Sequence, residues 1–241
     1  MLPILYSLQH CPYAMRARLG LLMAQQHVML RAITTKNKPE EMLAVSPKGT
    51  IPVLVLPDSF SIEESIKESV KDPDNGSIKE FGEEPIIIDE SLDIMVWALQ
   101  QNDPEDLLHK DSPSDLIAML DLIKRNDKEF KPQLELYKKA KRFRLENVIE
   151  ERQACEIFIA ELELKLATDG FFIGQKAGLI DYALLPFVRQ FSRVNRSWFI
   201  QAPYPNLRTW LEGHMQSRLY GKAMAKYPLW LDEHKVCFLG E

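Results

Sequence analysis

The sequence predicts an α/β domain at the N-terminus, at residues 1–101, followed by an all-α domain at residues 113–241. Two observations predict this fold class. Up to about residue 101, apolar runs of strand length alternate with apolar residues at helical spacing, whereas no convincing strand pattern follows Pro113. Residues 102–112 are polar and contain a proline, so we assign them as the linker between the two domains.

The first strand and the first helix meet at a cysteine. Residues 4–8 form a short apolar run, and from Tyr13 onward the apolar residues recur at helical spacing. Pro12 therefore falls in the first helical turn, where its missing N–H is not needed. Cys11 then lies at the N-terminal end of the helix, where free backbone N–H groups and the helix dipole favour a thiolate. Because Ala14 occupies the position of a second cysteine, disulfide chemistry would need an external thiol.

The rest of the α/β domain follows in order. A partly β-branched run at residues 28–33, a short helix through Met42 and a strand-like run at residues 51–56 come next. The strand, helix, strand order predicts that the first two strands are parallel. Residues 86–88 form the last strand, and an apolar-periodic helix follows it. Glu90 and Ser91 stand at the start of that helix, where such residues usually serve as a cap.

The segment 57–84 is an acidic insert between the last two strands. It carries nine acidic and three basic residues, so its local charge is −6, against −5 for the whole chain. Ile62, Ile66 and Val70 are spaced as on a short amphipathic helix. We expect the insert to be a solvent-exposed loop. The alternative is that it covers the site or contacts a partner.

The second domain is expected to be entirely helical. Apolar spacing indicates helices at residues 114–128, 147–168, 179–191 and 206–217, with a weaker one at 221–227. The basic run 138–144 is interpreted as a solvated helix face or loop. Cys155 falls on an apolar helical stripe and is assigned to the core. Asp181, in the first turn of its helix, is assigned a structural capping role.

Composition excludes several classes of protein. The 241 residues are 46% hydrophobic and 27% charged, which is enough for a sizeable core. A net charge of −5 gives no reason to expect binding to nucleic acid or to an anionic membrane. No apolar run approaches the ~20 residues of a membrane-spanning helix, and the first residues lack the basic segment of a secretory signal. Three widely spaced cysteines form neither a disulfide framework nor a metal cluster, so we expect no metal and a cytoplasmic location.

Several of these motifs together resemble a known family. Cys11-Pro12-Tyr13, Ile51-Pro52-Val53, Glu90-Ser91 and the segment from Gly170 to Pro186 occur in the order found in cytosolic glutathione S-transferases. The cysteine is similar to that of the omega class and its bacterial relatives. The resemblance implies a thioredoxin-like N-terminal domain with a mixed four-stranded sheet, a C-terminal helical-bundle domain and a cis Ile51-Pro52 bond.

The resemblance also implies a glutathione site. Cys11 would form a mixed disulfide with glutathione or stabilise its sulfur, and Tyr13 would line the site. Ile51 would pair its backbone with the cysteinyl part of the tripeptide, and Pro52 would shape that contact. Glu90 and Ser91 would bind the γ-glutamyl end.

Three basic residues, Lys38, Arg16 and Arg18, each have two alternative roles. Lys38 would pair with the glycyl carboxylate, although a solvated loop lysine needs no such role. Arg16 and Arg18 are expected either to solvate the helix or to favour the Cys11 thiolate by their charge.

Three functions follow from the resemblance. The leading one is glutathione-dependent thiol transfer by Cys11 through a monothiol mixed disulfide, with glutathione as co-substrate and a small disulfide as partner. The second is conjugation of glutathione to an electrophile, for which Tyr6 or Ser7 would supply a hydroxyl. The third is a non-enzymatic interaction protein that keeps the fold. Family members are commonly dimers, so we expect a homodimer.

Overall fold

The computed structural model describes residues 2–57 and 85–241. The amphipathic helix expected at Ile62, Ile66 and Val70, and the acidic insert beyond residue 57, lie outside the described residues.

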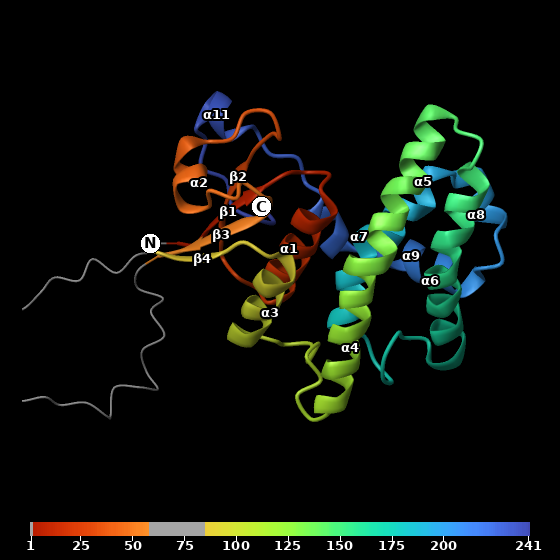
Figure 1. Ribbon diagram of the computed structural model, residues 1–241. Coiled ribbons are helices and arrows are strands. Elements are labelled where there is room, and N and C mark those ends of the chain that lie inside the picture. The colour runs from red at the N-terminus through yellow and green to blue at the C-terminus, as the bar shows by residue number, and fades with distance from the viewer. Residues whose placement is uncertain (1, 58–84) are drawn as a thin grey trace, which may run out of the picture.

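The N-terminal domain is a thioredoxin-like fold with a mixed four-stranded sheet, as predicted (Figure 1). The strands are β1 (Ile4–Ser7), β2 (Met29–Ala32), β3 (Val53–Leu56) and β4 (Ile86–Ile88). They lie in the order β2-β1-β3-β4; β1 is parallel to β2 and antiparallel to β3, and β3 is antiparallel to β4. The predicted parallel pairing of the first two strands is therefore confirmed.

Alternate residues of the strands face two different sets of helices. Leu5 and Leu54 belong to the large core that contains α1 (Pro12–Met23) and α3 (Ser91–Gln101). Tyr6 and Val53 point to the opposite face, where they pack with Met42 of α2 (Glu40–Val45). This alternation is the period of two expected of a strand. It leaves α1 and its N-terminus between the sheet and the helical domain (Figure 1).

The C-terminal domain is a helical bundle. Its helices are α4 (Pro113–Arg125), α5 (Lys131–Phe143), α6 (Val148–Asp169), α7 (Leu179–Val194), α8 (Arg196–Gln201), α9 (Pro205–Gln216) and α10 (Arg218–Ala223). Helix α7 packs against α1, α4 and α5. Asp181 caps α7 as predicted: Gly178 N–H donates to Asp181 Oδ2 over 2.9 Å, and Trp210 Nε1–H donates to Oδ1 over 3.2 Å. Burial raises the pKa of Asp181 to about 6. Cys155 is fully buried, which confirms its core assignment.

The helix at residues 131–143 was not predicted as such. A π-helical turn, η2 (Asn126–Phe130), joins α4 to α5, and the axis continues through Pro132. A proline inside a helix lacks a hydrogen-bond donor and clashes with the preceding turn. The wider π-turn directly before it accommodates this defect, so the basic run 138–144 lies on a helix that sequence periodicity did not reveal.

The last part of the described chain returns to the N-terminal sheet. The short helix α11 (Trp230–Glu233) lies beside α2 (Figure 1). Leu30 N–H donates to Cys237 O over 2.8 Å, and Leu239 N–H donates to Val28 O over 3.0 Å. The outer edge of β2 is thus covered by residues that follow the whole helical bundle. Among the described residues, no helix has the length and apolar character needed to cross a bilayer.

Candidate active site

Cys11 lies at the N-terminal end of α1, as the sequence predicts. Its backbone is extended at φ −70° and ψ 126°, its carbonyl accepts from Met15 N–H over 2.9 Å, and Pro12 occupies the first turn. The side chain is half-buried, and Sγ lies 3.8 Å from the carbonyl oxygen of Ile51, to which the thiol donates. The predicted cis Ile51-Pro52 bond is confirmed. Cys11, Ile51 and Pro52 therefore form one small cluster.

Arg18 supports the segment that leads into Cys11. Its guanidinium donates to Ser7 Oγ over 2.9 Å, to Leu8 O over 3.4 Å and to Gln9 O over 2.7 Å. The residue is 2% exposed, so the expectation that it solvates the helix is wrong. Burial lowers the pKa of Arg18 to about 10, and the electrostatic interaction with Cys11 acts in the opposite direction. The three acceptors fix the loop beneath the thiol.

Arg16 joins α1 to the helical domain. It is fully buried, which again contradicts a solvating role, and it donates from Nη1 and Nη2 to the two carboxylate oxygens of Asp127, each over 2.7 Å. Its Nε–H donates to Ala183 O on α7 over 3.0 Å. The charged side chain tolerates burial because each of its three nitrogens donates to an acceptor. One arginine therefore connects α1, η2 and α7.

Tyr13, which the sequence predicts to line the site, lies in the first turn of α1. Its ring packs edge-to-face on Phe187 with centroids 5.2 Å apart. Burial raises the pKa of Tyr13, as does electrostatic interaction with Asp127, Cys11 and Glu90, whereas the positive charge of Arg16 lowers it. Tyr13 is therefore within electrostatic range of both Cys11 and Glu90.

Glu90 and Ser91 stand at the N-terminus of α3. Lys48, which was not predicted from the sequence as a site residue, lies beside them. Ser91 is 3% exposed, and the side chain of Glu90, the N-cap residue, makes no capping hydrogen bond. Lys48 Nζ lies 2.5 Å from Glu90 Oε1 and 3.7 Å from Asp89 Oδ2, and the hydrogen bond to Glu90 raises the pKa of Lys48. The sequence feature that could have identified Lys48 is its position in the turn that leads into Ile51.

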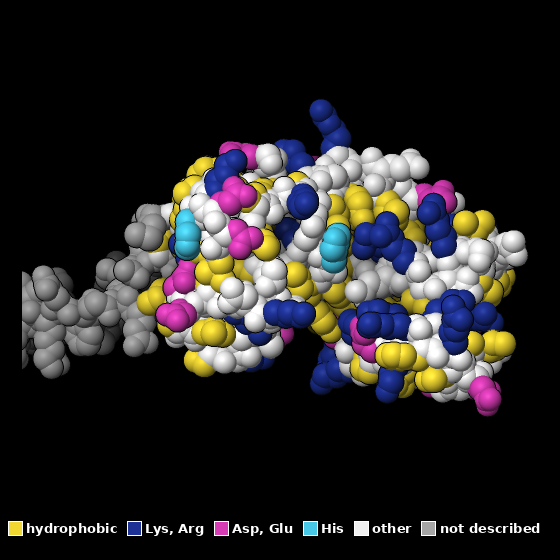
Figure 2. All heavy atoms as spheres, turned by 90° about the horizontal axis from the view of Figure 1, so that it is seen from above, with side chains coloured by type: hydrophobic (Ala, Val, Ile, Leu, Met, Phe, Trp, Pro, Cys, Tyr) yellow, Lys and Arg dark blue, Asp and Glu magenta, His cyan; other side chains and the backbone are white. Residues whose placement is uncertain are grey.

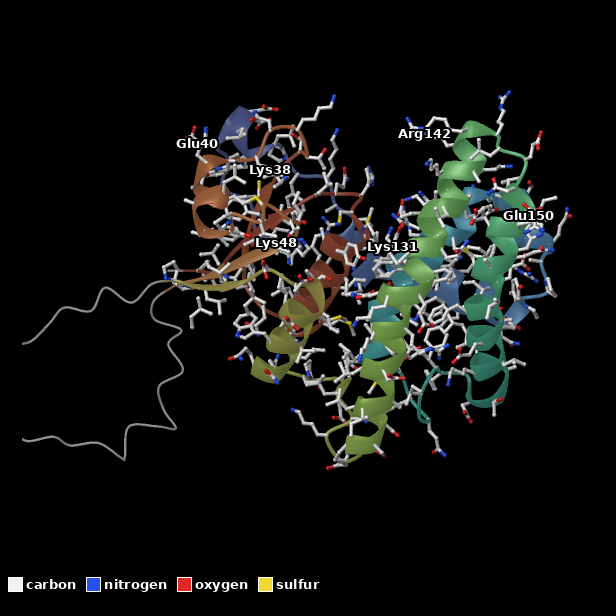
Figure 3. The ribbon with its side chains drawn as sticks, in the orientation of Figure 1. Lys38, Glu40, Lys48, Lys131, Arg142 and Glu150 are labelled. Atoms are coloured by element: carbon white, nitrogen blue, oxygen red, sulfur yellow. The ribbon has the colours of Figure 1, made fainter. Side chains whose placement is uncertain are left out.

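Lys38 lies beside the same turn, just before α2 (Figure 3). Its Nζ lies 3.4 Å from the position that a Cβ would take at Gly49, whose φ is +62°. Within residues 2–57 and 85–241, Lys38 forms no hydrogen bond or ion pair, so its ammonium is available to a ligand. The structure brings Lys38 to the turn before Ile51, and it brings Tyr13 and Glu90 to the surroundings of Cys11.

Lys131 is a second residue that sequence reasoning missed. It is the first residue of α5, directly after the π-turn, and its side chain is 12% exposed. In Figure 3 it lies where α5 passes α1. Burial lowers the pKa of Lys131 to about 8, helped by the positive charge of Lys138, whereas Cys11 and Asp127 favour its ammonium. It also pairs with Glu135. Because the sequence did not predict helix α5, it did not identify Lys131 as a candidate site residue.

The two hydroxyls proposed for a conjugating site are buried and already bonded. Tyr6 is 2% exposed, and its hydroxyl accepts from Arg31 Nη1 over 2.6 Å. Ser7 is 1% exposed and accepts from Arg18. In the part of the chain that the structure describes, no group of three or more His, Cys, Asp or Glu side chains could hold a metal ion.

Two family models match this chain. Residues 5–69 match the family model described as glutathione S-transferase, N-terminal domain, and residues 148–213 match that of the C-terminal domain, together more than half of the chain. A search of curated proteins found no match.

Solved structures share the fold at low identity. A glutathione transferase family member from Pseudomonas fluorescens pf-5, with two glutathione bound, has a TM-score of 0.71 at 14% identity, covering 92% of this chain and 92% of its own. Glutathione transferase Omega 2C from Trametes versicolor has a TM-score of 0.69 at 18% identity, covering 93% of each chain. Ure2p in complex with S-hexylglutathione has a TM-score of 0.70 at 15% identity, covering 93% and 98%. With the two domain matches and this fold, the chain belongs to the glutathione S-transferase family.

Proposed function

We propose that this protein is a glutathione-dependent thiol transferase that uses Cys11 in a monothiol mechanism. The observation that carries the proposal is the position of the Cys11 thiol at the N-terminus of α1, 3.8 Å from the Ile51 carbonyl. A helix N-terminus favours the thiolate, which is the nucleophile in disulfide exchange. Ala14, at the position of a second cysteine, leaves glutathione to resolve the intermediate.

Glutathione would bind between the Ile51-Pro52 segment and the N-terminus of α3. The Ile51 backbone would pair with its cysteinyl part beside Pro52, and Tyr13 would line the pocket. The γ-glutamyl carboxylate would meet the Ser91 hydroxyl and the N-terminus of α3, while its ammonium would share Glu90 with Lys48. Lys38, which has an available ammonium, would pair with the glycyl carboxylate.

The reaction proceeds in two exchanges. The Cys11 thiolate attacks the glutathione sulfur of a mixed disulfide, the S–S bond of the substrate breaks, and the substrate leaves as a thiolate that takes a proton. A second glutathione thiolate then attacks the glutathione sulfur bound to Cys11, which releases the Cys11 thiolate and oxidised glutathione. The sum converts one mixed disulfide and one glutathione into the substrate thiol and one molecule of oxidised glutathione.

The test is glutathione-dependent reduction of a small mixed disulfide by the wild type and by Cys11→Ser, with intact mass measured after exposure to oxidised glutathione. We expect activity that is lost in the variant and one glutathione adduct on Cys11. Glutathione binding without an adduct, and with conjugating activity that survives in Cys11→Ser, would overturn the proposal. The buried and bonded hydroxyls of Tyr6 and Ser7 give that alternative no support. Absence of any glutathione binding would instead favour a non-enzymatic interaction protein.

We propose further that the protein acts as a cytoplasmic homodimer, with glutathione as co-substrate and no metal. Ile157 and Leu164 of α6 lie on one helix face and are 77% and 69% exposed. Such exposed apolar side chains support an interface between copies. Light scattering after gel filtration of the wild type and Ile157→Glu tests this, with a monomeric wild type as the contradicting result.

A further inference from the structure

A basic groove lies between α5 and α7. Its volume is about 620 Å³, within the ~300–1,000 Å³ of small-ligand sites. Five basic side chains and one acidic side chain line it: Lys138, Lys139, Lys141, Arg142, Arg193 and Glu135. Because the whole chain carries a net charge of −5, this positive surface departs from the average of the protein. Figure 2 shows Lys and Arg side chains gathered over the helical domain on this side of the molecule.

The positive charges of the groove are largely uncompensated. Lys138 pairs with Glu135, with Nζ–Oε distances of 2.8 and 3.0 Å. The other four cations form no ion pair among the residues that the structure describes. A groove that gathers unpaired cations is an electrostatic site for an anionic ligand.

A row of charged side chains runs along one face of α5, from the groove to the end of the helix that passes α1. Lys131, Glu135, Lys138 and Arg142 are spaced i, i+4, i+7 and i+11, which aligns them on the helix. Lys131 stands at the end of the row where α5 passes α1, the helix that carries Cys11 at its N-terminus, and it interacts electrostatically with Cys11 and Lys138. Eleven residues of helix span ~16 Å. Figure 3 shows Lys131 where α5 passes α1 and Arg142 near the far end of α5.

Gln190 supplies an acceptor in the same groove. Its Oε1 is buried and has no hydrogen-bond partner within the described residues. A buried polar atom without a partner is costly, so a ligand that brings an N–H donor would satisfy it. A peptide backbone carries such donors, whereas a polyphosphate does not. Glu135, in the middle of the row, also disfavours a dense polyanion.

We propose that the second substrate is an acidic peptide whose cysteine carries glutathione, with its carboxylates bound in this groove while its disulfide meets Cys11. The inference rests on the proposed thiol transferase function and names the substrate class of the same site. An extended peptide rises ~3.3 Å per residue, so ~16 Å corresponds to about five residues. Acidic residues three to five positions from the cysteine are therefore the ones that reach Lys138, Arg142 and Arg193.

The experiment uses three glutathionylated peptides of equal length, with Glu, Gln or Lys at positions three to five on each side of one cysteine. The enzymes are the wild type, the groove variant Arg142→Glu/Arg193→Glu and the control Lys124→Glu. Lys124 is an exposed lysine of α4 that does not line the groove. Thermal unfolding midpoints of the three proteins establish that each is folded.

Binding is measured by fluorescence anisotropy with serine in place of the peptide cysteine, and turnover by release of the peptide thiol. For the wild type we expect the Glu peptide to exceed the Gln peptide about tenfold in affinity and in kcat/KM, with a loss of this preference at high salt. The groove variant should lose the preference and the control should keep it. Equal affinity for the Glu and Gln peptides, or a preference that survives in the groove variant, would overturn the inference. Preferential binding without turnover would support the groove and instead reject the proposed reaction.

Discussion

The Arg16 guanidinium and the Asp127 carboxylate form two parallel hydrogen bonds of 2.7 Å between α1 and the π-turn η2. Arg16 is fully buried, and the Asp127 side chain is 28% exposed. The same helix α1 carries Cys11 at its N-terminus. The ion pair therefore fixes the position of the thiol relative to the helical domain, where Lys131 lies.

Removal of the Asp127 charge should destabilise the protein strongly. Asp127→Asn leaves the Arg16 charge buried without a counterion, and the free energy of unfolding should fall by ~3–5 kcal/mol. The matched control is Glu161→Gln, because Glu161 forms a similar two-bond pair with Arg125 at 2.8 and 2.9 Å, but with both side chains about one-third exposed. That change should cost below ~1 kcal/mol. Equal losses in denaturant unfolding curves would contradict this prediction.

Arg18 should act as a positioning residue for Cys11. Arg18→Lys keeps the charge, but a single ammonium cannot reach the acceptors on Ser7, Leu8 and Gln9 together. We expect alkylation of Cys11 by iodoacetamide and turnover of a mixed disulfide to slow by about tenfold, with no change in KM for glutathione beyond ~2-fold. Arg144→Lys, at the exposed end of α5, serves as control. A loss of thermal stability with unchanged alkylation would show a structural role alone.

Lys38 should set the affinity for glutathione. Lys38→Met removes the ammonium proposed to pair with the glycyl carboxylate, and KM for glutathione should rise by about tenfold, since a charged hydrogen bond is worth ~1.5–3 kcal/mol. Lys36→Met, an exposed lysine on the same loop, should leave KM within ~2-fold. Identical KM values for the two variants would remove Lys38 from the site.

Lys131 should give the Cys11 reaction a pH dependence. The pKa of Lys131 is lowered to about 8, so its ammonium is present below that pH and is lost as the pH rises through it. Because a nearby positive charge favours a thiolate, Lys131→Met should slow alkylation of Cys11 at pH 7 by roughly three- to tenfold. The difference in alkylation rate between the variant and the wild type should become smaller above pH 8. If the ratio of the wild-type to the Lys131→Met alkylation rate stays constant from pH 6.5 to 9.5, Lys131 does not have this role. The same holds if Lys124→Gln slows alkylation with the same pH dependence.

Local patterns predicted the part of the site that a single strand and helix create. The apolar run before Cys11 and the proline after it identify a strand and a helix start, and the structure has both at these positions. The cis Ile51-Pro52 bond followed from family resemblance, since nothing in the spacing of residues requires it. The predicted contact of Cys11 with this segment arises because β1 and β3 are neighbours in the sheet.

The residues that the sequence did not reveal depend on contacts between segments that are distant in sequence. Arginine on a helix is ordinarily exposed, and the docking of α7 and η2 on α1 buries Arg16 beside an acceptor for each of its three nitrogens. Lys131 was hidden by Pro132, which interrupts the helical pattern at the point where η2 keeps the helix continuous. Lys48 pairs with Glu90 across a turn and a helix start that are distant in sequence.

The hydrogen bonds from Leu30 to Cys237 and from Leu239 to Val28 have a consequence for the order of folding during synthesis. A nascent chain that has reached the end of α3 contains all four strands, yet the edge of β2 still exposes unpaired backbone groups. That edge is covered only when residues 237–239 leave the ribosome, after the entire helical bundle. The domain that is translated first is therefore completed last, and until then its open strand edge is a place where a second nascent chain can pair.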